Sequence, residues 1–375
     1  MTYNLNDIRK EIDNIDTELL PLLIKRIKCS ENIAKYKIEN NLPIYNKHRE
    51  DEILANIVEK SGKYSLFSKI LYSNIMSVSK LRQQELFTYE NDIDTLLASS
   101  KKELPKSPSV LCQGTEGAYS HEAALKAFLN SSIIFAESFE DVFKGIKKGV
   151  ADFAVLPVEN SSAGSVSEVY SLIMKYKYYI VSAVNVPVSH CVAGLCESFD
   201  TVISHPQALL QCSNYISKKN LKQSPFINTA SSANYVSEKK LKDTAAICSV
   251  DAAKRYNLKI FEKNIQDDKH NNTRFAVISK EPIFTNNANK ISLCFSLQDK
   301  TGSLYKILEH FAFAGLDLTK IESRNISGKN FEYDFYLDFK GSVADKKVSS
   351  LICELSKNYK NFTFLGNYFE ENCKK

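Results

Sequence analysis

Seven arginines stand out in a chain that otherwise carries its positive charge on lysine, and they occur at positions 9, 26, 49, 82, 255, 274 and 324. Arginine differs from lysine because its planar guanidinium can bind a carboxylate through two parallel hydrogen bonds. Each arginine is therefore a candidate for binding a ligand that carries carboxylates. The alternative, that an arginine replaced a lysine through mutational drift, stays open for any single position.

Two cations continue the apolar face of the first predicted helix. Isoleucine and leucine recur at a spacing of three to four residues from Leu5 to Leu22, a pattern typical of an amphipathic helix. Arg26 and Lys37 follow on the same face, because their separation at about 100° per residue leaves them only about 20° apart. Burying a cation costs free energy unless an anion lies beside it, so the pattern favours a pocket for an anionic ligand. The alternative is that both side chains reach solvent at the edge of the face.

Polar residues on two further predicted helices offer the rest of such a pocket. They are Asn46, Arg49 and Glu50 at the start of the helix Lys47–Ser61, and Ser79 and Gln83 on one face of the helix Leu66–Ser99. These polar residues do not include a nucleophile paired with a general base. Arg9 precedes Arg26 by 17 residues. Since that is about 25 Å along a helix, Arg9 would reach the pocket only from a second copy of the chain.

The segment from Leu5 to about Gln84 resembles the all-helical chorismate mutase family, in which the protein supplies shape and charge to a unimolecular rearrangement of chorismate to prephenate. The resemblance implies that Arg9 of a partner chain and Arg26 hold substrate carboxylates, that Lys37 and Gln83 bind the ether oxygen, that Glu50 holds the ring hydroxyl, and that Asn46, Arg49 and Ser79 complete the pocket. The family often has aspartate at the position of Asn46, which predicts altered binding rather than lost activity.

Four polar patches lie in the middle of the chain, where short β-branched runs alternate with helical segments. They are Gln113–Ser120 (QGTEGAYS), Pro157–Gly164 (PVENSSAG), Ser204–Cys212 (SHPQALLQC) and Asn272–Phe275 (NTRF). The alternation predicts an α/β architecture with ligand-binding groups at the ends of strands. Taken singly, each patch is also accounted for by a helix cap or a turn.

Together and in this order, the four patches closely resemble the prephenate dehydratase family over Val110–Ile278. The resemblance implies two α/β lobes, like those of a periplasmic binding protein, with the site in the cleft between them. The reaction releases hydroxide and carbon dioxide from a ring that becomes aromatic, and it implies neither a metal nor another cofactor. The residues implied are Thr273 as hydrogen-bond donor to the leaving group, Arg274 as partner of a carboxylate, Phe275 as a wall of the pocket, and Asn160, Ser161, Ser204 and Gln211 as groups that orient the substrate.

The last part of the chain predicts a ferredoxin-like module, because its elements follow the order βαββαβ. The elements are the strand Lys290–Leu297, the helix Ser303–Ala314, the strands Leu318–Ile326 and Phe331–Phe339, the helix Asp345–Asn358 and the strand Asn361–Phe369. The module resembles the amino-acid-binding ACT domain attached to dehydratases. The resemblance implies a phenylalanine effector site between paired modules, formed by Gly302, Ser303 and Leu304 and by Glu322, Ser323 and Arg324. The alternative is a dimerisation module that has lost its ligand.

The chain is thus predicted to be a multidomain protein. Residues 1–92 form an all-α, three-helix mutase domain, and because three helices bury only a thin core we expect an intertwined dimer. A linker at 93–107 leads to an α/β, two-lobed dehydratase domain at 108–284, and an α+β, ferredoxin-like ACT domain occupies 288–370. Pro21 lies inside the first helix and predicts a kink there.

The composition argues against several classes of protein. The formal net charge of +5 comes without a dense basic block, which argues against nucleic-acid binding. No stretch approaches the roughly 20 apolar residues that span a membrane, and the N-terminus lacks the apolar core of a signal peptide. The nine cysteines show neither zinc-site nor disulfide spacing. We expect a cytoplasmic protein with no nucleic-acid or membrane partner.

We therefore predict a bifunctional enzyme that converts chorismate to prephenate, and prephenate to phenylpyruvate, carbon dioxide and water. It would act as a homodimer or larger homo-oligomer under feedback inhibition by phenylalanine. Two enzymatic alternatives stay open: a dehydratase whose mutase domain is degenerate, and a dehydratase that prefers arogenate. A third alternative is a non-catalytic amino-acid sensor, against which Thr273 speaks because a binding module has no need of that group.

Overall fold

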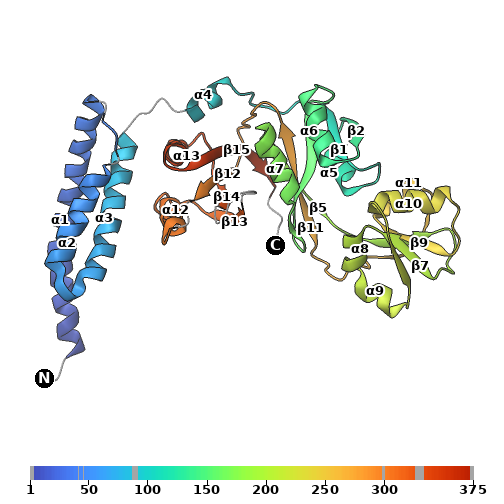
Figure 1. Ribbon diagram of the computed structural model, residues 1–375, viewed down its shortest axis with the longest axis horizontal. Helices are drawn as coiled ribbons and strands as arrows, with labels where there is room; N and C mark the ends of the chain where they lie inside the picture. Colours follow the sequence, from blue (N-terminus) through green and yellow to red (C-terminus); the bar gives the residue numbers. More distant parts are fainter. Residues whose placement is uncertain are drawn as a thin grey trace.

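The computed structural model describes residues 4–40, 42–44, 46–86, 92–297, 300–325 and 333–371 (Figure 1). A helical segment lies at one end of the molecule and an α/β lobe at the other. The other α/β lobe, which is described below as the first lobe, and a C-terminal module lie between them. The predicted combination of an all-α segment and an α/β segment is confirmed.

The helical segment consists of α1 (Leu5–Glu39), α2 (Lys47–Ser61) and α3 (Ser65–Leu86), with the short 3₁₀ turn η1 (Gly62–Tyr64) before α3. α1 begins after Asn4, whose side chain accepts a hydrogen bond from the backbone N of Asn6 at 3.1 Å. α1 continues through Pro21 as a single helix, so the predicted kink does not interrupt it. Every side chain from Asn4 to Leu20 is exposed in the described part of the chain, although this stretch carries the apolar face.

The residues that follow the bundle differ from the predicted long helix and linker. α3 ends at Leu86, and a separate helix α4 (Asp92–Ser99) begins beyond residues 87–91, which lie outside the described part of the chain. Ile93 is 5% exposed and packs into the core of the C-terminal module, where Leu96 and Leu97 also contact it. The start of the predicted linker is therefore a packed helix, because three of its apolar residues share one face.

The first lobe of the central α/β part is built on a mixed sheet with the strand order β5-β11-β3-β1-β2. Its strands are β1 (Ser109–Gln113), β2 (Ser132–Ala136), β3 (Phe153–Asn160), β5 (Tyr179–Pro187) and β11 (Asn272–Ser279), with β4 (Gly164–Ser165) paired to β3. Its helices are α5 (Tyr119–Ala127), α6 (Phe139–Lys147) and α7 (Ser167–Tyr176).

The second lobe has its own five-stranded sheet in the order β10-β6-β9-β7-β8. Its strands are β6 (Cys191–Gly194), β7 (Thr201–Ser204), β8 (Lys222–Pro225), β9 (Thr244–Cys248) and β10 (Lys259–Lys263). Its helices are α8 (Pro206–Gln211), α9 (Ser213–Lys218), α10 (Thr229–Glu238) and α11 (Val250–Arg255). The chain enters this lobe after β5 and leaves it before β11, so two crossing segments join the lobes.

The C-terminal module has the predicted βαββαβ order and the strand order β13-β14-β12-β15, which is the ferredoxin-like arrangement. Its elements are β12 (Lys290–Leu297), α12 (Ser303–Phe313), β13 (Leu318–Asn325), β14 (Tyr333–Lys340), α13 (Lys346–Asn358) and β15 (Lys360–Glu370). The predicted strand ends at Ile326 and Phe331 lie outside the described residues.

The C-terminal module and the first lobe share one continuous ten-stranded sheet, because β15 pairs with β5 in parallel. The two strands approach closely at Gly366, where φ is +153° and a Cβ atom would lie 2.0 Å from the backbone oxygen of Ile180. Only glycine fits such an approach. Tyr336 and Tyr368 of the module also belong to the same buried apolar cluster as residues of the first lobe. The module and the lobe are therefore joined through a common core.

Candidate active sites

Arg26 lies half-buried between α1 and α3 and has neutral partners. Its Nη1 donates to the hydroxyl of Ser79 and, at 3.3 Å, to the backbone oxygen of Ile75. No ion pair reaches Arg26 within the described residues. Since hydroxyl and carbonyl oxygens do not neutralise a guanidinium, this arginine keeps its charge available for an anion.

Lys37 lies farther along α1 beside Gln83. Its Nζ donates to the backbone oxygen of Ile44 at 2.5 Å and to Oε1 of Gln83 at 3.1 Å. Burial lowers the pKa of Lys37, and the nearby Glu50 carboxylate partly offsets that effect. Glu50 in turn forms an ion pair with Lys80 at 3.1 Å. The structure thus assembles three cations, Arg26, Lys37 and Lys80, with one amide and one carboxylate in the bundle.

Three residues predicted for this site lie apart from that group. Asn46 caps α2, since its Oδ1 accepts a hydrogen bond from the backbone N of Arg49 at 3.0 Å. The guanidinium of Arg49 is exposed and pairs with Glu52 at 3.1 Å. Arg9 is exposed on the N-terminal half of α1. Within one chain, none of the three side chains is brought to Arg26 and Lys37.

Thr273 and Asn160 face each other on the paired strands β11 and β3. Oδ1 of Asn160 accepts from the backbone N of Ser162 at 3.1 Å and of Ala163 at 2.9 Å, so its Nδ2 must point the other way. That Nδ2 donates to Oγ1 of Thr273 at 2.9 Å. Because the threonine oxygen accepts here, its own hydrogen is available to a substrate.

A cavity of about 230 Å³ lies between the two lobes, close to this pair. It is lined by Ser162 of the first lobe, by Gln207, Leu210 and Gln211 of α8, and by Gln266, Asp267, Asp268 and Asn271 of the crossing segment. Asn271 connects the cavity to Thr273, because Nδ2 of Asn160 also donates to Oδ1 of Asn271 at 2.7 Å. The interlobe site therefore holds mainly amides and hydroxyls, together with two carboxylates.

His190 orients Gln211, and it lies outside every motif singled out in the sequence. The ring is 1% exposed; Nε2 lies 3.0 Å from Oε1 of Gln211, and Nδ1 lies 3.2 Å from the hydroxyl of Tyr119. Burial lowers the pKa of His190, although the contact with Gln211 opposes this. In the tautomer that donates from Nε2 to Oε1 of Gln211, Nδ1 accepts from the Tyr119 hydroxyl, whose hydrogen is shared with the backbone oxygen of Ser189 at 2.8 Å, and the amide NH₂ of Gln211 is available as a donor.

The remaining residues predicted for this site have structural partners. Ser204 is fully buried, and its hydroxyl donates to the backbone oxygen of Ile247 at 2.6 Å. Phe275 is 2% exposed and packs in the core of the first lobe. Oγ of Ser161 accepts from the backbone N of Asn272 at 2.9 Å. These three side chains support the walls of the cleft rather than line its cavity.

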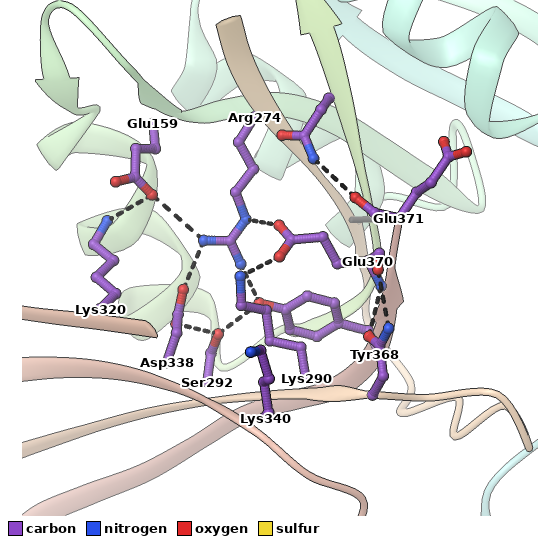
Figure 2. A network of polar contacts seen from close by, with 12 residues as sticks. Glu159, Arg274, Lys290, Ser292, Lys320, Asp338, Lys340, Tyr368, Glu370 and Glu371 are labelled. Carbon is purple, nitrogen blue, oxygen red and sulfur yellow. Dashed lines mark hydrogen bonds and ion pairs between the residues drawn. The ribbon is translucent and has the colours of Figure 1, made fainter. Parts of the chain in front are cut away.

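Arg274 lies in the junction with the C-terminal module, where it points toward Asp338, Tyr368 and Glu370 (Figure 2). Its Nη1 lies 2.6 Å from Asp338, its Nε lies 2.5 Å from Glu370, and its Nη2 donates to the hydroxyl of Tyr368. Glu159 approaches Nη1 at 3.5 Å. Asp338, Glu370 and Tyr368 therefore surround this guanidinium, and the contact of Nε with Glu370 is an ion pair without hydrogen-bond geometry. The predicted contact with a substrate carboxylate stays a prediction, and the geometry favours a role in the junction.

Two of the three predicted effector residues on β13, Glu322 and Arg324, share this junction. Lys320, Glu322 and Arg324 alternate with exposed neighbours such as Ser323, so the three lie on the face of the sheet turned to the first lobe. Glu322 accepts a hydrogen bond from the hydroxyl of Ser165 on β4. Gly302, with φ of +82°, Ser303 and Leu304 lie at the start of α12. The strand motif thus contacts β4, which is paired with the end of β3 that carries Asn160.

Among the described residues, no group of three histidine, cysteine, aspartate or glutamate side chains is placed to hold a metal ion. No helix among them combines the length and the apolar character needed to cross a membrane.

Comparisons with known proteins identify the family. A family model described as chorismate mutase type II matches residues 8–84, and one described as prephenate dehydratase matches residues 110–283. The bifunctional chorismate mutase/prephenate dehydratase of Aquifex aeolicus is 32% identical over 369 residues, which cover 97% of each chain. This chain belongs to the bifunctional chorismate mutase/prephenate dehydratase family.

Two further similarities concern the dehydratase side of this family. The chloroplastic arogenate dehydratase/prephenate dehydratase 1 of Arabidopsis thaliana is 39% identical over 276 residues, 68% of this chain and 70% of its own. A solved prephenate dehydratase from Arthrobacter aurescens, in complex with L-Phe, is 25% identical with a TM-score of 0.64 and covers 70% of this chain and 90% of its own.

The predicted activities are confirmed by this membership. The chain is a chorismate mutase and prephenate dehydratase, and it converts chorismate to prephenate and prephenate to phenylpyruvate, carbon dioxide and water. These reactions fit the biosynthesis of phenylalanine.

Proposed function

We propose that the mutase reaction takes place in the helical bundle, with domains bounded at residues 1–92, 108–284 and 288–370. Arg26 would hold a substrate carboxylate, Lys37 and Gln83 the ether oxygen, and Glu50 the ring hydroxyl. Arg26 carries this proposal, because its described partners are neutral oxygens. Arg49, Ser79 and Asn46 would shape the pocket, Ser79 by fixing the guanidinium and Asn46 by capping α2.

The mutase site is proposed to be completed by a second copy of the chain. Leu5, Ile12 and Ile15 are between 51% and 60% exposed on α1, which costs free energy until another apolar surface covers them. A partner helix laid against this face would bring the partner's copy of Arg9 toward the pocket. Sedimentation of the full chain would test the dimer, and Arg9→Ala would test whether mutase activity needs that side chain.

We propose that Thr273 donates a hydrogen bond to the departing hydroxyl of prephenate. The observation that carries this role is the contact from Asn160, which uses the acceptor capacity of the threonine oxygen and leaves its hydrogen free. Asn160 and Gln211 would orient the substrate, with Ser161, Ser204 and Phe275 holding the surrounding backbone. Thr273→Ala should lower dehydratase turnover by about 100-fold or more while mutase turnover stays unchanged.

Phenylalanine is proposed to inhibit the dehydratase by binding to the C-terminal module as an ACT domain. The related enzyme from Arthrobacter aurescens was solved with L-Phe. In this chain the hydrogen bond between Glu322 and Ser165 supports the proposal, because it joins the proposed effector motif to the strand after the Asn160 loop. Gly302, Ser303 and Leu304 would offer a helix N-terminus to the carboxylate of the amino acid.

A two-substrate assay tests both steps and their regulation. Purified full-length chain would receive chorismate or prephenate, with and without phenylalanine, and prephenate and phenylpyruvate would be measured separately. The proposal expects turnover of both substrates and inhibition of the second step alone. Activity that phenylalanine leaves unchanged would contradict the regulatory part. Arogenate belongs in the same assay, since the similarity to plant arogenate dehydratases makes it the second candidate substrate.

We also propose that the enzyme works in the cytoplasm. All eight described cysteines are free, which suits a reducing compartment.

A further inference from the structure

The amide of Asn271 is buried, has a defined orientation and lacks a partner for its donors. Asn271 is 2% exposed, and its Nδ2 has no hydrogen-bond partner among the described residues. Buried amide donors are nearly always satisfied in folded proteins. An exception in the wall of an interlobe cavity calls for an explanation.

The orientation of this amide follows from backbone groups and does not depend on a choice between its oxygen and nitrogen. Backbone N–H groups of Ser162 and Ala163 donate to Oδ1 of Asn160, which places the Asn160 nitrogen on the opposite side. That nitrogen donates to the Asn271 side chain at 2.7 Å, so the atom it meets must be the Asn271 oxygen. Two N–H groups of Asn271 are left over.

We propose that Asn271 is a second hydrogen-bond donor to the departing hydroxyl of the substrate, beside Thr273. The inference rests on the proposed role of Thr273. Both side chains contact the same nitrogen of Asn160, at 2.7 Å and 2.9 Å, so they meet the same end of a bound molecule. Asn271 is then a catalytic residue of the dehydratase that the sequence motifs did not reveal.

The chemistry explains why two donors are useful there. The bond between the ring and its carboxylate breaks and releases carbon dioxide, and its electron pair enters the ring. The bond between the ring and the hydroxyl breaks, and its pair leaves with oxygen as hydroxide, which takes a proton from solvent to become water. Negative charge therefore grows on that oxygen in the transition state. Fixed donors aimed at such an oxygen stabilise the transition state more than the ground state.

The test compares Asn271→Ala and Asn271→Asp with Asn272→Asp in the full-length chain, using prephenate as substrate. The alanine variant removes the whole amide, whereas the aspartate variant keeps an oxygen that accepts from Asn160 and replaces the two donors with a second acceptor and a negative charge. In the control, Asn272 is a neighbour whose amide donates to the backbone oxygen of His270 at 2.9 Å. Thermal unfolding of each variant confirms that it folds.

We expect kcat to fall by about 100- to 1000-fold in both Asn271 variants, as for the loss of one oxyanion donor. KM should change by less than about threefold in Asn271→Ala, because the donor acts in the transition state. Asn272→Asp should keep nearly all activity. A kcat within about fivefold of wild type in Asn271→Ala would overturn the inference, and so would a raised KM with unchanged kcat.

These outcomes are separable from the proposed role of Thr273. Thr273→Ala is measured in the same assay, and its activity tests that role alone. If Thr273→Ala is inactive while Asn271→Ala is active, the proposed function stands and the inference about Asn271 fails.

Discussion

Arg26 and Arg274 place the same side chain in opposite surroundings. Arg26 has a hydroxyl and a carbonyl oxygen as its described partners, in a half-buried position between two helices. Arg274 is 9% exposed and has carboxylates on Nε and Nη1 and a phenol on Nη2. A guanidinium that the protein already neutralises has little left to offer a ligand, whereas one with neutral partners still attracts an anion.

The two arginines are therefore expected to have different roles. Arg26 is predicted to affect catalysis far more than stability. Arg274 is predicted to affect stability more than substrate binding, because its partners Asp338, Tyr368 and Glu370 all belong to the C-terminal module. Lys290 is likewise predicted to affect stability, because it pairs with Glu370 in the junction (Figure 2).

The largest expected effect is on stability at the junction. Arg274→Ala should lower the free energy of unfolding by about 3–5 kcal/mol, because it leaves buried carboxylates without a counter-charge. Urea unfolding followed by tyrosine fluorescence would measure the change. Arg255→Ala is the matched control: its partners Asp251 and Glu116 are exposed, so the loss should stay below about 1 kcal/mol. Equal losses in the two variants would break the comparison.

Next in size is the effect of Arg26 on the mutase. Arg26→Ala should lower kcat/KM for chorismate by about 100- to 1000-fold, since an electrostatic contact to the reacting substrate is lost. Arg82→Ala is its control in the same bundle, because Arg82 pairs with Glu31 at 2.6 Å and Glu85 at 2.7 Å and should cost less than about fivefold. If Arg82→Ala proved the more harmful, a partnered arginine would be the functional one.

Much of the fold and part of the mutase site could be predicted from local features of the sequence. The three-to-four residue spacing of apolar residues identified α1 and showed that Arg26 and Lys37 share a face, and the structure brings both next to α3. The βαββαβ order was equally visible, because each element there has its own apolar period. Predictions of this kind need only residues that are close along the chain.

Contacts between residues that are distant along the chain could not be predicted from the sequence. Asp338 lies 64 residues after Arg274 and Glu370 lies 96 after it, so nothing near the Thr-Arg-Phe motif shows that its arginine is already neutralised. The same holds for His190, whose contact with Gln211 depends on how β6 meets α8. Asn271 escaped notice because an unsatisfied amide is defined only by the atoms around it.

A smaller effect is expected from acid on the junction. Burial raises the pKa of Asp338, but Arg274, the hydrogen bond from Ser292 and the charge of Lys290 together outweigh burial, and the net shift is downward. The stability contributed by this carboxylate is therefore present above its ordinary pKa of about 3.9 and is lost as pH falls through the lowered folded-state value. Urea unfolding between about pH 7 and about pH 3 would follow the loss.

The variant Asp338→Asn should remove that acid dependence and cost about 1.5–3 kcal/mol at neutral pH, the range for hydrogen bonds to charged groups. Asp334→Asn is the control on the same strand, since Asp334 accepts a hydrogen bond from Ser296 at 2.6 Å and does not contact Arg274. An unchanged acid profile in Asp338→Asn would show that the charge of Asp338 does not hold the junction.

The smallest expected effect concerns Lys37 at alkaline pH. Burial lowers the pKa of Lys37 from 10.5, with Glu50 opposing the shift, so mutase activity should fall as pH rises through that lowered value. The fall reflects lost positive charge beside the substrate and should reach about tenfold. In Lys37→Arg the guanidinium stays charged, and its activity, although lower from the change of shape, should stay level over the same pH range. A parallel fall in both variants would assign the titration to a group other than Lys37.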